Sequence, residues 1–389
     1  MAAGGVPGGR LILVVILMAS VFAMAQGLSY PLLAFILERQ GVSPALIGLN
    51  TAMTPLGIVC SAPLVPLAAR LMGAARMALA CALMLACVLA VIGAWQNLAV
   101  WFPARFLIGV AINGLFVASE TWVNLMAPPE RRGRLLGLFS ASLAAGFALG
   151  PFIIVVTGTR GWPPFLVGVA VFLATALILF LARRQLPSIH GDGHASIRAF
   201  LPLAPFLLLT VAAAAAFDQG SLALLPSYGR AFGVGEAEMA TALGVLILGN
   251  ILFQVPIGWL ADRWSRRGTM LLLCSVTIAG AILLPLVIGS PLPTLALFFV
   301  WGSTAYGIYT VALIDLGDRF GGALLLSGNA AFSLMWGFGG MTGPPAFGLA
   351  IALLGPHGLP LMLGLLYAVL LVAALGWRAG MPVPQPVRR

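Results

Sequence analysis

An aspartate lies inside an apolar stretch of the sequence, where a charged side chain is costly. Asp218 follows a run of alanines and a phenylalanine in AAAAAFDQGSLALLPSYG, residues 212–229. An acid near the centre of a membrane helix costs about 2.5–3.5 kcal/mol on insertion scales. Burial disfavours the charged form of a carboxyl group, so Asp218 is suited to bind a proton and release it as its hydration changes. The alternative is an acid that pairs with a structural donor or hydrates an outer vestibule.

Arg105 is a cation within another apolar segment, in RFLIGVAING, residues 105–114. A buried guanidinium could hold an anionic group of a substrate or alter the proton affinity of a nearby acid. It could equally bond to backbone carbonyls or extend its charged end toward the membrane surface.

Two further acids, Glu120 and Asp315, occupy matching places in ASETWVN (118–124) and ALIDLGD (312–318). Both lie close to loops that carry arginines, so we expect ion pairs that hold one side of the molecule closed. We expect Glu120 to pair with Arg70 or Arg76. We expect Asp315 to pair with Arg266 or Arg267. A second possibility makes Glu120 another proton site.

Several polar and aromatic side chains accompany these charges in the apolar segments. A largely apolar pocket with few polar groups is typical of a small-molecule site, and this set favours an amphiphilic, partly aromatic substrate. Any one of them could instead serve packing. The candidate substrate-binding residues are Gln26, Tyr30, Asn113, Gln219, Trp301, Tyr306 and Tyr309.

The composition indicates that these apolar segments lie in a lipid bilayer. Hydrophobic residues make up 61% of the 389 residues and charged residues 8%, whereas about a quarter of a soluble domain is charged. The first apolar segment follows Arg10 and continues to Leu37, too long for a signal peptide. Twelve segments are near the length of a bilayer-spanning helix, at 11–37, 45–69, 77–95, 99–124, 135–157, 164–182, 201–226, 239–261, 269–289, 294–316, 324–354 and 358–378.

The basic residues, all of them arginine, predict the orientation. Most fall in alternate loops, and only Arg39, Arg160 and Arg230 fall in the other set. The positive-inside rule therefore places both termini in the cytoplasm. The polar stretch RRQLPSIHGDGHASIRAF predicts a cytoplasmic linker, 185–200, between an N-terminal bundle (1–184) and a C-terminal bundle (201–389).

The two halves repeat at an offset of about 192 residues. AQGLSY at 25–30 corresponds to DQGSLA at 218–223, and the loop PLAARLMGAAR at 66–76 corresponds to GWLADRWSRRG at 258–268. Gly150–Pro151 corresponds to Gly343–Pro344. Matches at a nearly constant offset indicate an internal duplication, an arrangement known in secondary transporters.

With these features the chain resembles the major facilitator superfamily over essentially its whole length. The loop GWLADRWSRR (258–267) is similar to the signature loop of that family. Its matching charged residues are Asp262, Arg263, Arg266 and Arg267. The first-half loop departs from the pattern, because Arg70 stands where the family has an acid and only Gly73 and Arg76 fit.

The resemblance also carries expectations about mechanism. RFLIGVAING resembles a family motif linked to proton coupling, and GFALGP, with Gly150 and Pro151, resembles a motif of the drug/proton antiporters. The family fold implies twelve membrane helices in two pseudo-symmetric six-helix bundles that rock to give alternating access. Its first, fourth, seventh and tenth helices would line the central cavity.

These observations predict a monomeric secondary transporter of a bacterial-type inner membrane, which exchanges protons for a small amphiphilic molecule and exports it. The alternatives are a proton-coupled importer of an organic anion, anchored by Arg105, and a membrane sensor or assembly partner that transports nothing.

No P-loop, HExxH or GxSxG motif is present, so we expect neither an enzyme nor a cofactor. The arginines form no nucleic-acid-binding stripe. His190 and His194 are spaced like metal ligands, but we expect no metal, because histidines in a polar loop are usually solvated.

Overall fold

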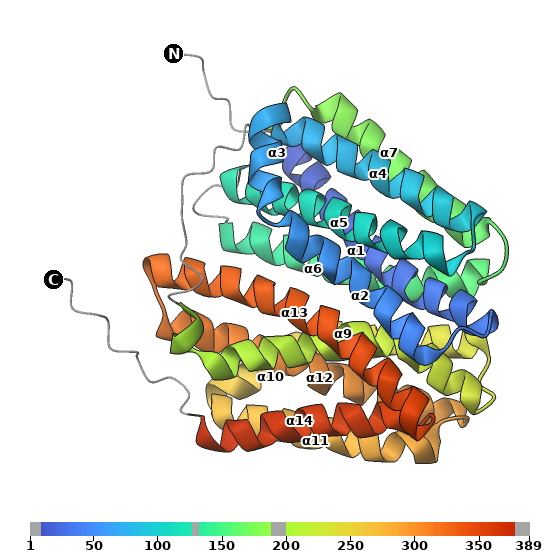
Figure 1. The fold of residues 1–389 in the computed structure, drawn as a ribbon. Coiled ribbons are helices and arrows are strands. Elements are labelled where there is room, and N and C mark those ends of the chain that lie inside the picture. The colour runs from blue at the N-terminus through green and yellow to red at the C-terminus, as the bar shows by residue number, and fades with distance from the viewer. Residues whose placement is uncertain (1–8, 127–131, 188–199, 378–389) are drawn as a thin grey trace. The chain divides into compact units, whose positions relative to one another are not determined.

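The computed structural model describes residues 9–126, 132–187 and 200–377, in which helices dominate and no β-strand occurs (Figure 1). The prediction of an all-α membrane fold is confirmed. Most of the predicted linker, with His190 and His194, lies outside the described residues. The N-terminal helices are α1 (Gly9–Arg39), α2 (Pro44–Ser61), α3 (Leu64–Met72), α4 (Ala74–Ala94), α5 (Leu98–Met126), α6 (Arg132–Thr157) and α7 (Pro163–Ala182). The C-terminal ones are the 3₁₀ turn η2 (Leu201–Leu203), α9 (Pro205–Ala231), α10 (Glu236–Arg263), α11 (Arg266–Val287), α12 (Pro291–Arg319), α13 (Gly322–Leu354) and α14 (Gly358–Gly376).

The chain divides into two compact units. The first comprises residues 1–40 and 53–192, and the second comprises 41–52 and 193–389. The start of α2 is therefore grouped with the C-terminal helices. Two glycines show the close contact between this part of α2 and α13. A Cβ at Gly48 of α2 would clash with the backbone of α13, and a Cβ at Gly348 of α13 would clash with the backbone of α2.

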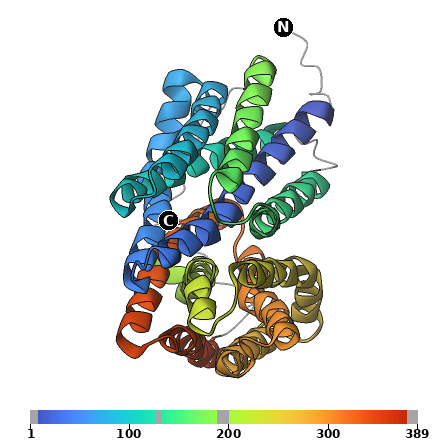
Figure 2. The same ribbon diagram turned by 90° about the vertical axis from the view of Figure 1, so that its right-hand side faces the viewer.

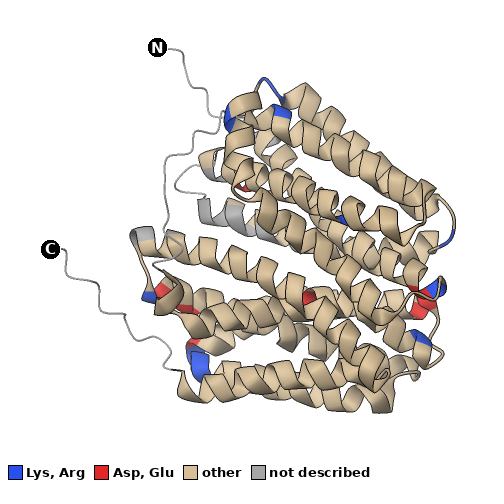
Figure 3. Ribbon diagram, in the orientation of Figure 1, with Lys and Arg blue, Asp and Glu red and all other residues tan. Residues whose placement is uncertain are grey.

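The helices have the length and composition of membrane spans. Among the described residues, eleven helices are long and apolar enough to cross a bilayer, and α6 adds a shorter apolar stretch, Ala141–Thr157. Acidic and basic residues lie mostly at helix ends and seldom along helix middles (Figure 3). This distribution is expected of a protein whose solvent is lipid, because charges near the bilayer centre are costly.

One predicted span, 45–69, is not a single helix. Helix α2 ends at Ser61 and α3 begins at Leu64, with Pro63 at its N-cap. Proline has no N–H group, so Pro63 and Pro66 leave the carbonyls four residues earlier without their helical partners. We call residues 61–64 the α2–α3 elbow.

The side chain of Asn113 on α5 holds the elbow. Its amide nitrogen donates to the Ser61 hydroxyl at 3.0 Å and to the Ile58 carbonyl at 3.3 Å. The Ser61 hydroxyl in turn donates to the same carbonyl at 3.1 Å. These bonds tie α5 to the end of α2 beside the break.

The internal repeat is confirmed by close contacts between helix backbones. A Cβ at Gly109 on α5 would lie 1.9 Å from the carbonyl oxygen of Thr54 on α2. At an offset of 192 or 193 residues, a Cβ at Gly302 on α12 would lie 1.9 Å from the carbonyl oxygen of Leu246 on α10. Small residues let membrane helices approach closely, so both halves use glycine at the same crossing.

A second pair of crossings repeats in the same way. Helix α1 packs along α6, and α9 packs along α13, which lie side by side in both views (Figures 1 and 2). A Cβ at Gly146 would lie 2.1 Å from the Ser20 carbonyl oxygen, and one at Gly339 would lie 2.0 Å from that of Ala212. The scaffold that positions the site residues is therefore the same in each unit.

Candidate functional site

Asp218 lies in the interior of the second unit, bonded to a phenol. The α9 side chain is 6% exposed, and the Tyr306 hydroxyl of α12 donates to its Oδ1 at 2.6 Å. A short hydrogen bond to a carboxylate is among the stronger polar contacts in proteins. The structure thus brings together the candidate proton site and one candidate substrate-binding residue.

An aromatic cluster surrounds this bond and fixes the position of Tyr306. The ring of Phe217 lies 5.3 Å from that of Trp301, 5.6 Å from that of Tyr306 and 5.9 Å from that of Tyr367, all at steep angles. The Tyr367 hydroxyl donates to the Ala305 carbonyl at 2.8 Å. Edge-to-face pairs of this kind favour one orientation of each ring. The packing of these rings therefore directs the phenol of Tyr306 at Asp218.

Trp301 takes part in packing in this cluster. Its indole nitrogen donates to the Thr277 carbonyl of α11 at 3.0 Å, and the Thr277 hydroxyl lies 3.0 Å from that of Thr304. Its side chain is 1% exposed. These contacts occupy the polar group through which the sequence predicted a role in substrate binding.

The remaining candidates on α9 and α12 have different surroundings. The Gln219 amide lies against α13, where a Cβ at Gly340 would be 2.2 Å from its Nε2 atom. Tyr309 is half-buried, and its ring lies 5.3 Å from Trp336 and 6.3 Å from Phe332. Of the two, the partly exposed Tyr309 is the more accessible to a ligand.

The first unit contains a buried cation on α5, the repeat of the helix that carries Tyr306. Arg105 of α5 is 2% exposed, and its guanidinium carbon lies 5.5 Å from the centre of the Tyr30 ring of α1. A guanidinium over a tyrosine face is attracted by the ring, more so when both are removed from water. Gln26, one turn earlier on α1, is half-buried.

Glu120 and Asn113 complete the first-unit candidates. Glu120 lies on α5 with an exposed side chain. The amide nitrogen of Asn113 is engaged by the α2–α3 elbow. Arg105 and Asp218 belong to different units.

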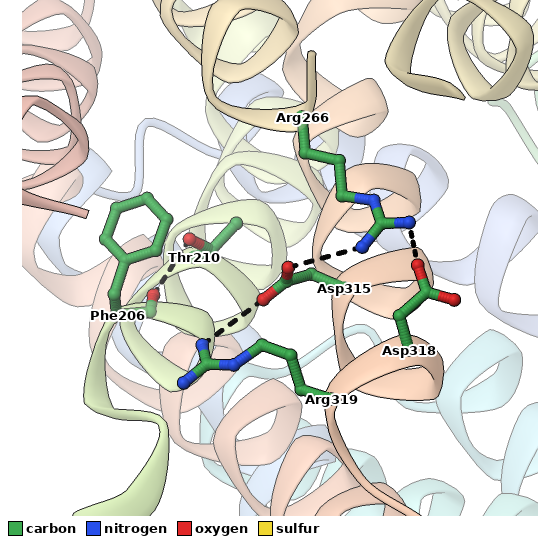
Figure 4. A network of polar contacts seen from close by, with 6 residues as sticks. All are labelled: Phe206, Thr210, Arg266, Asp315, Asp318 and Arg319. Atoms are coloured by element: carbon green, nitrogen blue, oxygen red, sulfur yellow. Dashed lines mark hydrogen bonds and ion pairs between the residues drawn. The ribbon is translucent and has the colours of Figure 1, made fainter. Parts of the chain in front are cut away.

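A network of ion pairs joins α11 and α12 (Figure 4). Arg266 lies 3.7 Å from Asp315 and also contacts Asp318, and Arg319 donates to Asp315 at 3.3 Å. Asp315 is fully buried, whereas Asp318 is half exposed. The predicted pair between Arg266 and Asp315 is present, and its role as a gate stays a prediction. Asp318 and Arg319 were not among the predicted residues, although their spacing of three and four residues from Asp315 places them on one helix face.

The remaining loop candidates flank the neighbouring α10–α11 turn, at the end of α10 and the start of α11. Asp262 and Arg263 are exposed, and the Arg263 guanidinium lies 5.0 Å from the Trp259 ring centre. Arg267 donates to the carbonyl of Leu375 on α14. This turn is therefore tied to both α12 and α14.

In the first unit, Gly150 and Pro151 of α6 are buried. A Cβ at Gly150 would lie 2.0 Å from the carbonyl carbon of Gly27 on α1. The antiporter-like motif thus serves the α1–α6 crossing.

An all-helical membrane fold with two repeated bundles and a few buried charges is typical of one class, the secondary membrane transporters. The model of the Major Facilitator Superfamily matches residues 15–321 and 207–389. The chain belongs to this superfamily, as its motifs indicated.

Relatives of known sequence carry transporter names. The chain is 28% identical over 349 residues to the uncharacterized MFS-type transporter YfkF of Bacillus subtilis (strain 168), covering 86% of this chain and 87% of the relative. It is 28% identical over 258 residues to the uncharacterized MFS-type transporter YcaD of Escherichia coli O139:H28, covering 65% of each chain. The protein is therefore a multi-pass membrane transporter.

Solved structures share the fold at low sequence identity. A nucleoside transporter, NupG, superposes with a TM-score of 0.76 at 14% identity, covering 94% of this chain and 99% of that one. A D-xylose–proton symporter gives a TM-score of 0.74 at 14% identity, covering 96% and 99%. At these identities the likeness concerns the fold alone.

Proposed function

We propose that the protein is a proton-coupled exporter of small amphiphilic molecules in a bacterial inner membrane, with Asp218 as the residue that carries the proton. The observation that supports this most is the buried contact between Asp218 and Tyr306 in an otherwise apolar helix. Proton coupling needs a group that binds and releases a proton during the cycle, and a buried carboxyl group provides one.

Two opposing effects make Asp218 suited to this role. Desolvation disfavours its charged form, and the hydrogen bond donated by Tyr306 favours it. A movement that admits water or shifts Tyr306 would change the balance between the two. Proton binding on one side of the membrane and release on the other follow from such a change.

The half-buried Tyr309, whose ring lies beside that of Trp336, suits an amphiphilic, partly aromatic substrate. In the first unit, Arg105 over Tyr30 supports the alternative in which the substrate is an organic anion and is imported. Opposite directions of uptake in right-side-out and inside-out vesicles separate these two functions.

The proposal is tested with ethidium, an aromatic cation, in inside-out vesicles that carry an imposed pH gradient. Asp218→Asn is expected to abolish gradient-driven accumulation, because the amide cannot release a proton. The same variant should retain ethidium exchange without a gradient, because the amide resembles the protonated acid. Asp218→Glu should recover part of the accumulation.

Glu238→Gln serves as the matched control, since it removes an exposed carboxylate elsewhere in the second unit. It should leave accumulation unchanged. Full concentrative transport by Asp218→Asn would contradict the proposal. If benzoate, an aromatic anion, is accumulated by right-side-out vesicles and ethidium moves in neither, the import alternative holds.

A further inference from the structure

The hydroxyl of Ser221 differs from most buried hydroxyls in the membrane helices. Ser221 lies on α9, in the second unit, and its side chain is 0% exposed. Within the described part of the chain, its Oγ atom has no hydrogen-bond partner. A buried polar group without a partner destabilises a fold, so such a group in a native protein needs a physical explanation.

The common arrangement in these helices is a bond from the hydroxyl to the carbonyl four residues earlier. Ser119 of α5, also 0% exposed, donates to the Leu115 carbonyl at 2.7 Å. The corresponding carbonyl for Ser221 is that of Phe217, and the Ser221 hydroxyl does not bond to it. The hydroxyl is therefore available to another acceptor.

The carboxylate of Asp218 lies one helical turn before Ser221 on the same face of α9. Residues three apart on a helix are neighbours, with about 5–6 Å between their Cβ atoms. Helical side chains lean toward the N-terminus, so the Ser221 side chain lies over the turn that carries Asp218. At that spacing a rotation of either side chain is sufficient to bring a carboxylate oxygen to the hydroxyl.

The two possible donors to Asp218 respond differently to a movement of the helices. Tyr306 donates to its Oδ1 at 2.6 Å from a separate helix, α12. A carboxylate accepts several hydrogen bonds, so this contact leaves capacity for a second donor. A shift of α9 relative to α12 would lengthen the bond from Tyr306. Ser221 would stay beside the carboxylate, because both belong to α9.

We propose that Ser221 is a positioning residue for Asp218, whose hydroxyl bonds to the carboxyl group when the phenol of Tyr306 moves away during the transport cycle. A serine hydroxyl can donate to the carboxylate and accept from the protonated acid, so Ser221 pairs with either form. The carboxyl group thus alternates between a partner on α12 and a partner on its own helix. This inference rests on the proposed function, in which Asp218 binds and releases the proton.

The transport test compares Ser221→Ala with Ser119→Ala, which removes an equally buried hydroxyl that is already bonded to the backbone. In inside-out vesicles with an imposed pH gradient, Ser221→Ala should lower the rate of ethidium accumulation about tenfold, as loss of a hydrogen bond to a charged group does. Ethidium exchange without a gradient should be unchanged. Ser119→Ala should accumulate ethidium like the wild type. Ser221→Cys, which retains a weak donor, should recover part of the rate.

Thermal unfolding separates this role from simple packing. Because the Ser221 hydroxyl has no partner in the folded protein, Ser221→Ala should unfold at the temperature of the wild type or above it. A lower unfolding temperature together with lost accumulation would overturn the proposal, since it would show that the hydroxyl supports the fold. Unchanged accumulation in Ser221→Ala would overturn it as well.

Infrared difference spectra between low and high pH report on the hydrogen bond without transport. The carbonyl stretch that disappears in Asp218→Asn belongs to the protonated Asp218 side chain. In a Tyr306→Phe background, which removes the phenol hydroxyl, Ser221→Ala should shift this stretch and Ser119→Ala should not.

The infrared result distinguishes this proposal from the proposed function. An unshifted stretch in Ser221→Ala would overturn the role of Ser221 even if Asp218→Asn abolishes accumulation. Full accumulation by Asp218→Asn would instead contradict the proposed function, and a shifted stretch would then still establish the hydrogen bond between Ser221 and Asp218.

Discussion

Each unit holds a buried charge within a corresponding pair of helices, but the two charges are opposite in sign and lie on different members of the pair. In the first, Arg105 of α5 lies over the ring face of Tyr30 of α1. In the second, Asp218 of α9, the repeat of α1, accepts a hydrogen bond from Tyr306 of α12, the repeat of α5. The charge in the first unit contacts the ring face of one tyrosine, whereas the charge in the second unit contacts the hydroxyl of another. A duplicated scaffold has therefore kept its helix crossings while its buried chemistry diverged.

A single position shows how this divergence arose. Asn113 and Tyr306 are separated by the repeat offset of 193 residues. The amide of Asn113 bonds to the α2–α3 elbow, whereas the phenol of Tyr306 reaches Asp218. In the second half the helix α10 is continuous and needs no such support. The equivalent position was thus free to serve the buried acid.

The largest loss of stability is expected from substitutions at the glycine crossings, where the two units are most alike. Gly109→Ala and Gly302→Ala should each destabilise the protein by about 3 kcal/mol or more, because the added Cβ meets a backbone oxygen that cannot move aside. Gly317→Ala, with no neighbour within 4 Å of its Cβ position, is the control. The measurement is the monodisperse fraction after gel filtration. Tolerance of one substitution and not the other would break the comparison.

A smaller effect should distinguish the two tyrosines. Tyr306→Phe removes the hydrogen bond to Asp218 and should lower gradient-driven transport about tenfold, since bonds to charged groups contribute about 1.5–3 kcal/mol. Tyr30→Phe retains the ring face that Arg105 covers and should remain within about twofold of the wild type. Initial rates of ethidium accumulation give both values. Equal losses would show that the two centres work alike.

The smallest effect concerns the loops that follow α3 and α10. Arg266→Gln should lower stability by about 1 kcal/mol, because Asp315 loses one of its two arginines and Asp318 loses its contact. Arg76→Gln in the first-half turn should change stability by less than about 0.5 kcal/mol, as exposed substitutions usually do. Thermal unfolding in detergent measures the difference. A larger loss in Arg76→Gln would reverse the proposed contrast between these loops.

The fold could be predicted from the sequence because it follows from apolar segment length and from repetition. The elbow could not, since proline alone does not mark a break in a membrane helix. Helix α1 continues through Pro31, and α13 continues through both Pro344 and Pro345. Only the position of Asn113 opposite Ser61 shows where a break is supported.

The site was predictable in its residues and less so in its contacts. Asp218 was identified because acids are rare in membrane helices. Its partner Tyr306 lies 88 residues away, and nothing in the local sequence specifies that pairing. The contributions of Phe217 and Tyr367 depend on ring packing between three helices and leave no pattern in the sequence.

The glycine crossings constrain how the chain is assembled during synthesis. Helix α1 meets α6 through residues such as Ser20 and Ser142, which are 122 positions apart. Helix α9 meets α13 only after α10, α11 and α12 have been made. In a nascent chain, the faces of α1 and α9 that later pack against α6 and α13 are therefore exposed to lipid until those helices emerge from the ribosome. Chains truncated before α6 or α13 should be recognised by quality-control proteases as incomplete.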